Sequence, residues 1–148
     1  MLMKFDYPER MFEHCMYFNT SALARRLERE WAVAFKPFAL APPQAFVLRA
    51  VLAQPGASLF ELADTLAISR PTATRALEGL ASKGLITGLS SDRDARQIAV
   101  HPTPSALSMA AGLNDASARV TKKLKRLLGD QAFDGLVREI RGVRSALK

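Results

Sequence analysis

Apolar residues recur at helical spacing over most of the chain, and proline or glycine interrupts the pattern where helices should end. Between Met11 and Phe35 they fall every three or four positions, which predicts a first helix that Pro37 terminates. Pro43 suits the first turn of a second helix, because the N–H that proline lacks would be unpaired there. Residues 54–56, Gln-Pro-Gly, stop that second helix.

Two short helical segments follow, and each begins with a capping residue. Ser58 and Glu61 form a capping box, S-x-x-E, before an apolar run that ends near Leu66. Ser69 caps the next helix, where Pro71 in the first turn costs no hydrogen bond. The buried stripe of this helix consists of Ala73, Leu77 and Leu80, and its stop signal is Lys83-Gly84.

The pattern then changes to two short strands, predicted at 85–87 and 97–101, joined by a charged connection. Thr103-Pro104 opens a long amphipathic helix that ends at Gly129, and Asp130 caps a last helix. This order predicts a mainly α fold with a small β-hairpin wing, a winged helix-turn-helix.

One domain accounts for the whole chain, residues 1–148, because no low-complexity linker or internal repeat divides it. We expect a winged-helix lobe over 37–104. The two helices predicted in the segment 105–148 have larger apolar stripes than such a lobe alone would cover, which indicates a surface that another chain could cover.

Charge and composition narrow the class of partner. The net charge of +7 and the sequence pI of about 10.1 favour a polyanion, nucleic acid before membrane. A single cysteine excludes an internal disulfide and suits a reducing compartment. The chain has no apolar run of membrane-spanning length and no signal-peptide pattern at its start, so a cytoplasmic protein is expected.

The sequence favours no enzyme class. It offers no nucleophile–base pair, paired carboxylates or glycine-rich phosphate loop. His14 and His101 are the two histidines, and with one cysteine they make no metal-binding spacing. We therefore expect no catalytic residue, no metal and no cofactor.

The helix that begins near residue 70 has the composition of a DNA-reading element. Its N-terminal half presents small residues and two arginines opposite the apolar stripe, so it could enter the major groove of duplex DNA and fork an arginine onto guanine. The start of the helix also offers free N–H groups to a phosphate. The candidate contacts are Ser69, Arg70, Pro71, Thr72, Thr74 and Arg75.

The predicted wing carries charges at its tip. Arg93 and Arg96 could enter the minor groove, where narrow A·T tracts concentrate negative potential. Asp92 and Asp94 cannot favour phosphate themselves, so they are expected to hold these arginines by ion pairing.

At these residues the chain resembles the MarR family of bacterial transcriptional regulators. The strongest likeness is ISRPTATRALEGLASKGLI followed by DRDARQIAVHPT, in which Asp94-Ala95-Arg96 fits the family's wing motif; Pro102 and Ala106 depart from it. The resemblance implies a homodimer, with 11–36 and 105–148 as its dimerisation helices. Such a dimer would place its two winged helices in successive major grooves of a pseudo-palindromic operator. It also implies a repressor released by a small effector, often a phenolic or other anionic aromatic. Candidate pocket residues are Trp31, Phe35, Phe38 and Phe46, although for each residue taken singly a place in the core is favoured.

Cys15 raises an alternative, because one branch of the family senses hydroperoxides through a cysteine early in its first helix. The tyrosine partners expected there are missing, and Cys15 falls on the apolar face with Phe12 and Phe18, so a buried structural cysteine is favoured. A helical interaction module that no longer binds DNA is a further alternative, which salt-dependent duplex binding would separate from the first two.

Overall fold

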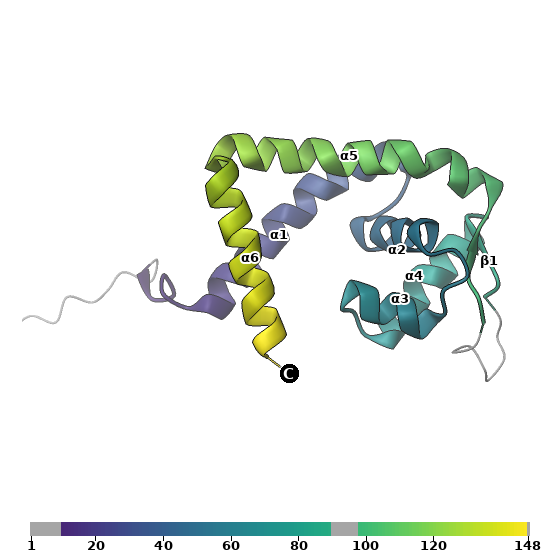
Figure 1. Cartoon of the computed structure of the whole chain (residues 1–148), viewed down its shortest axis with the longest axis horizontal. Coiled ribbons are helices and arrows are strands. Elements are labelled where there is room, and N and C mark those ends of the chain that lie inside the picture. The colour runs from purple at the N-terminus through teal and green to yellow at the C-terminus, as the bar shows by residue number, and fades with distance from the viewer. Residues whose placement is uncertain (1–9, 90–97, 148) are drawn as a thin grey trace, which may run out of the picture.

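The computed structural model describes residues 10–89 and 98–147. Figure 1 shows a long helix along one edge, a helical lobe beneath one end of it and a last helix folding back from the other end. The elements in chain order are α1 (Met16–Phe35), the 3-10 turn η2 (Lys36–Phe38), α2 (Pro42–Ala53), α3 (Leu59–Leu66), α4 (Arg70–Ser82), β1 (Ile86–Thr87), β2 (His101–Pro102), α5 (Pro104–Leu128) and α6 (Asp130–Ala146). The predicted mainly α fold with a two-stranded wing is confirmed.

Three helices begin where their capping residues predict. The Ser58 hydroxyl accepts the Glu61 N–H at 3.2 Å and opens α3, and Ser69 opens α4 in the same way. Thr103 caps α5 with Pro104 in its first turn. The expectation for Asp130 is wrong: it is the first residue of α6, and Gly129 precedes the helix without a side-chain cap.

The first helix is shorter than predicted, because it begins at Met16 and not at Met11. The backbone of Cys15 is extended (φ −84°, ψ 116°), so Cys15 is the N-cap. The Asn19 amide donates to the carbonyl oxygens of Glu13 and Cys15, both at 2.8 Å. These bonds stabilise the turn that precedes α1, and local side-chain bonds of this kind compete with helix.

The two strands of the wing are shorter than predicted, and the second one begins only at His101. Ile86 pairs with Pro102 and Thr87 with His101, in antiparallel order. Val100, expected inside the second strand, instead makes an isolated bridge with Ala57, which precedes α3. Gly88 (φ +93°) follows β1, and a Cβ at this position would collide with the Ala99 carbonyl oxygen, so the close approach of the two chains requires glycine.

The hydrophobic core lies within the lobe and extends to α5. It joins buried residues of α2, α3, α4 and the sheet to Phe35 of α1 and to Leu113 and Ala116 of α5. Because α5 contributes to the same core, the lobe is fixed to the first half of this long helix. No residue of α6 is buried within the chain.

The part of α5 beyond the lobe packs against α1. Lys123 of α5 and Glu30 of α1 form an ion pair of 2.8 Å with both side chains about half exposed. An exposed pair of this kind contributes about 0–1 kcal/mol, so packing rather than charge holds the two helices together. Within the described residues, no helix combines the length and the apolar character needed to cross a bilayer.

Candidate nucleic-acid interface and ligand groove

Helix α4 buries one face and leaves the predicted contact residues on the other. Ala73, Ala76, Leu77 and Leu80 pack into the core between α2 and α3. The side chains of Arg70, Pro71 and Arg75 are exposed, and those of Thr72 and Thr74 are partly exposed. The structure therefore gathers the candidate residues on the outward side of the N-terminal half of α4, the geometry that a recognition helix requires.

Hydrogen bonds organise this outward surface. The Ser69 hydroxyl donates to Thr72 Oγ1 at 2.8 Å while accepting the Thr72 N–H at 3.2 Å. Arg75 Nη2 in turn donates to Thr72 Oγ1 at 3.5 Å, so the cap of the helix continues to the arginine one turn later. The Thr74 hydroxyl donates to the Arg70 carbonyl at 2.9 Å.

Arg70 is held differently, by the aromatic ring of Phe60 in α3. Its guanidinium carbon lies 3.6 Å from the centre of that ring. The sequence predicts a role for the arginine but gives no sign of the phenylalanine. The spacing of residues 60 and 70 does not reveal their contact, because the contact depends on the angle between α3 and α4.

The far end of α4 is fixed by Lys83, which sequence analysis took only as a stop signal. Its ammonium group donates to the Ala39 carbonyl at 2.6 Å and to Gln44 Oε1 at 3.1 Å. Ala39 has a left-handed backbone (φ 55°) directly after η2. Lys83 thus connects the C-terminus of the recognition helix to the turn between α1 and α2.

The predicted wing-tip residues Asp92, Arg93, Asp94 and Arg96 lie outside the described residues, so their roles stay predictions. The base of the wing is described: β1 follows α4 after a three-residue turn, and β2 leads into α5. The wing therefore starts beside the recognition helix, as Figure 1 shows.

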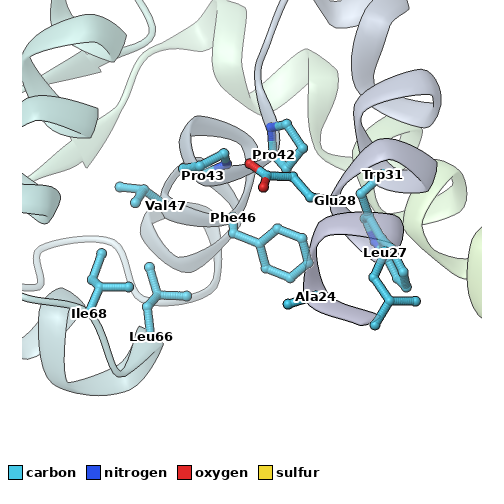
Figure 2. A pocket seen from close by; sticks show the side chains of 10 residues that line it. All are labelled: Ala24, Leu27, Glu28, Trp31, Pro42, Pro43, Phe46, Val47, Leu66 and Ile68. Carbon is cyan, nitrogen blue, oxygen red and sulfur yellow. The ribbon is translucent and has the colours of Figure 1, made fainter. Parts of the chain in front are cut away.

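An apolar groove of about 460 Å³ lies between α1, α2 and the segment after α3. Figure 2 shows the Phe46 ring projecting from α2 toward Ala24 and Leu27 of α1. The lining residues are Ala24, Leu27, Glu28, Trp31, Pro42, Pro43, Phe46, Val47, Leu66 and Ile68. Trp31 and Phe46 thus line a groove, as the sequence suggested.

The other two aromatic candidates do not line it. Phe35 is 0% exposed and belongs to the core, where its ring meets Phe46 edge to face at 6.0 Å. Phe38 packs against α5, and a Cβ on Gly112 would lie 2.9 Å from its ring. Phe35 ends α1 and Phe38 ends η2, so both rings fill the junction where the chain turns into the lobe.

A second hollow of about 430 Å³ shares Phe46 and Leu66 with this groove and is lined by Arg49 of α2. Arg49 Nε donates to Asn114 Oδ1 at 3.0 Å, and its Nη1 donates to Ser117 Oγ at 3.2 Å. Trp31 Nε1 donates to the same Ser117 oxygen at 3.0 Å. Arg49 therefore links α2 to α5 and, through Ser117, to the tryptophan of α1.

Arg49 is a cationic group beside the apolar groove, since it lines the second hollow that shares Phe46 and Leu66 with the groove. Its guanidinium carbon lies 5.0 Å from the centre of the Phe46 ring. Burial lowers the pKa of Arg49 from its usual value. Among the described residues, no carboxylate forms an ion pair with it. The result is a partly desolvated cation with N–H donors to spare, which sequence analysis missed because its partners are 65 and 68 residues away.

Cys15 is exposed in this chain, so the expectation of a buried structural cysteine is wrong for the monomer. The reason is its position. As the N-cap it precedes the helix and does not share the apolar face of α1, and its sulfur accepts the Phe18 N–H at 3.5 Å.

Comparison with known proteins relates the central part of the chain to a family of regulators. A sequence profile described as the MarR family matches residues 40–97, which span α2, α3, α4 and β1. The fold of nearly the whole chain agrees with solved MarR-type regulators. Residues 40–97 are therefore similar to the MarR family, and the fold of nearly the whole chain is that of MarR-type regulators. These similarities support a DNA-binding transcriptional regulator.

Three solved structures illustrate the similarity. The transcriptional repressor CouR bound to p-coumaroyl-CoA is 25% identical, with a TM-score of 0.76 over 87% of this chain and 91% of that one. CouR bound to a 23-mer DNA duplex is 24% identical, with a TM-score of 0.75 over 87% and 92%. The S. aureus MepR–DNA complex is 17% identical, with a TM-score of 0.78 over 92% and 100%. No curated protein sequence matches the chain.

Proposed function

We propose that this protein is a dimeric repressor of the MarR type that binds a pseudo-palindromic operator and is released by an anionic aromatic ligand. In this proposal the lobe of residues 37–104 binds DNA, and the segments 11–36 and 105–148 form the dimer. The observation that supports release by an anionic aromatic ligand is the half-buried Arg49 beside an apolar groove.

Exposed apolar side chains support a dimer. They project from α6 and from the start of α1, which lie at the same end of the molecule in Figure 1. Exposed apolar side chains gathered at one end of a molecule favour an interface with another protein chain. A two-fold dimer would hold two α4 helices about 34–36 Å apart, one turn of DNA. The side chains are Met16, Tyr17, Phe18, Leu136, Val137, Ile140 and Val143.

The DNA contacts proposed are those of the outward face of α4, namely Ser69, Arg70, Pro71, Thr72, Thr74 and Arg75. CouR and MepR were each solved with DNA, and this chain shares their fold. The arginines of the predicted wing, Arg93 and Arg96, would add contacts to the phosphate backbone or the minor groove.

The ligand would place its ring in the apolar groove against Trp31 and Phe46 and its negative charge at Arg49. CouR was solved with p-coumaroyl-CoA, a compound that combines a phenolic ring with phosphate groups. An anion at Arg49 would compete with Asn114 and Ser117 for the guanidinium N–H groups. Because those bonds join α2 to α5, their loss would shift the DNA-binding lobe relative to the dimer helices.

The sole tryptophan, Trp31, makes this proposal directly measurable. We expect cinnamate to change Trp31 fluorescence and to release a duplex selected by the protein from a random pool. Cinnamamide is uncharged, and hydrogen bonds to an ionised partner are the stronger ones. The concentration of cinnamamide needed for the fluorescence change and for release of the duplex should therefore be at least about tenfold higher.

The matched variants are Arg49→Gln and Arg29→Gln. Arg29 is an exposed arginine of α1 that does not line the groove. Arg49→Gln should remove the preference for the acid over the amide, whereas Arg29→Gln should retain it. Equal affinity for acid and amide in the unmodified protein would contradict the role of Arg49.

A second candidate function rests on the exposure of Cys15. An exposed thiol can be oxidised by a hydroperoxide to a sulfenic acid, with the peroxide reduced to the alcohol. Cys15 lies at the end of α1 remote from α4, so Cys15→Ser should leave DNA binding unchanged (Figure 1). If Cys15 is a sensor, cumene hydroperoxide weakens a gel shift of the unmodified protein and not of Cys15→Ser, and mass spectrometry detects the oxidised thiol. An unchanged gel shift with fully oxidised Cys15 would rule out this function.

A further inference from the structure

Phe60 is an aromatic residue of α3, and its ring lies next to Arg70, the first residue of α4. Its ring is half-buried, and one face is covered by the guanidinium of Arg70 at 3.6 Å. At this separation the planar guanidinium stacks on the ring face, an arrangement that arginine adopts and a compact ammonium does not.

The stack leaves the hydrogen-bonding edge of Arg70 free. Among the described residues, no hydrogen bond or ion pair involves its guanidinium. Arginine carries five N–H donors in one plane, so stacking one face does not use them. Arg75, in contrast, already donates to Thr72. The two arginines of α4 are therefore oriented by different means, one by a ring and the other by a hydroxyl.

We propose that Phe60 is a positioning residue for DNA binding, because it holds the Arg70 guanidinium in the orientation that meets the duplex. A free arginine side chain loses much rotamer freedom when it binds DNA, and a side chain already held on a rigid ring loses less. Phe60 itself does not supply the hydrogen bonds; it raises the fraction of molecules in which Arg70 is ready to make them. This inference rests on the DNA-binding function and adds a residue of α3 to the interface.

The test is a double-mutant cycle in the full-length protein, with a duplex selected by the unmodified protein as probe. We expect Phe60→Leu to weaken binding about fivefold, the range of an exposed cation–π contact. Phe60→Met should behave like Phe60→Leu, and Phe60→Tyr, which keeps the ring, should bind like the unmodified protein. In an Arg70→Ala background, Phe60→Leu should have no further effect on affinity.

Thermal melting separates positioning from a structural role. Phe60 packs against the core, so Phe60→Leu should lower the melting temperature both with and without Arg70, while the loss of affinity should require Arg70. If affinity falls by the same factor in both backgrounds, or if Phe60→Tyr binds as weakly as Phe60→Leu, Phe60 acts through the stability of α3 and the inference is wrong. Failure of the unmodified protein to bind any duplex would contradict the DNA-binding function itself, whereas equal affinity of Phe60→Leu and the unmodified protein would contradict only the role of Phe60.

Discussion

Ile140→Asp is expected to convert the protein into a monomer and to lower its affinity for the selected duplex about 100-fold or more. Ile140 lies in the middle of the apolar side of α6 and is 44% exposed in the single chain. In the proposed dimer it would be covered, and an unpaired carboxylate buried there costs several kcal/mol. Two linked winged helices bind with an avidity that one alone lacks, typically by a factor of about 100 to 10,000.

The measurement is sedimentation at micromolar concentration, followed by a gel shift at constant salt. Gln131→Asp is the matched control, because it adds the same charge to the same helix away from the apolar stripe. Thermal melting of both variants would establish that the lobe, whose core does not include α6, remains folded. A full-length unmodified protein that sediments as a monomer and still binds the inverted repeat tightly would contradict the dimer.

The helices of this fold could be predicted because their signals are local. Ser58, Ser69 and Thr103 each cap a helix within three residues of themselves, and the Pro and Gly positions mark the ends. The start of α1 was missed because Asn19 stabilises the preceding turn through side-chain bonds that apolar periodicity does not record. The second strand was misplaced because Val100 pairs with Ala57, a partner 43 residues earlier that its own neighbours do not reveal.

The residues of the candidate site also differ in whether a local sequence signal predicts them. The outward face of α4 follows from the spacing of Ala73, Leu77 and Leu80, so its contact residues could be proposed from sequence. Phe60 and Arg49 could not, since each acts through the packing of one helix on another. The residue type does not distinguish the aromatic residues that line the groove from those that fill the core. Trp31 and Phe46 line the groove, whereas Phe35 is buried in the core and Phe38 packs against α5.

The second large effect is expected at Arg75, whose side chain projects from the middle of the outward face of α4. If it forks onto a guanine, Arg75→Ala should cost about 1–3 kcal/mol on the selected duplex, which is about 5- to 150-fold in affinity. On a random duplex the loss should be much smaller, because binding there depends on phosphate contacts.

Arg75→Lys separates these two roles, since lysine keeps the charge but cannot make the bidentate fork. It should retain binding to random duplex and lose the preference for the selected one, with Arg26→Ala on α1 as the control for loss of a surface arginine. Thr72→Val should give a weaker version of the same change, because it removes the hydroxyl that accepts the Arg75 N–H. If Arg75→Ala weakens binding to both duplexes equally, Arg75 contacts phosphate, and base recognition must come from other residues of the helix.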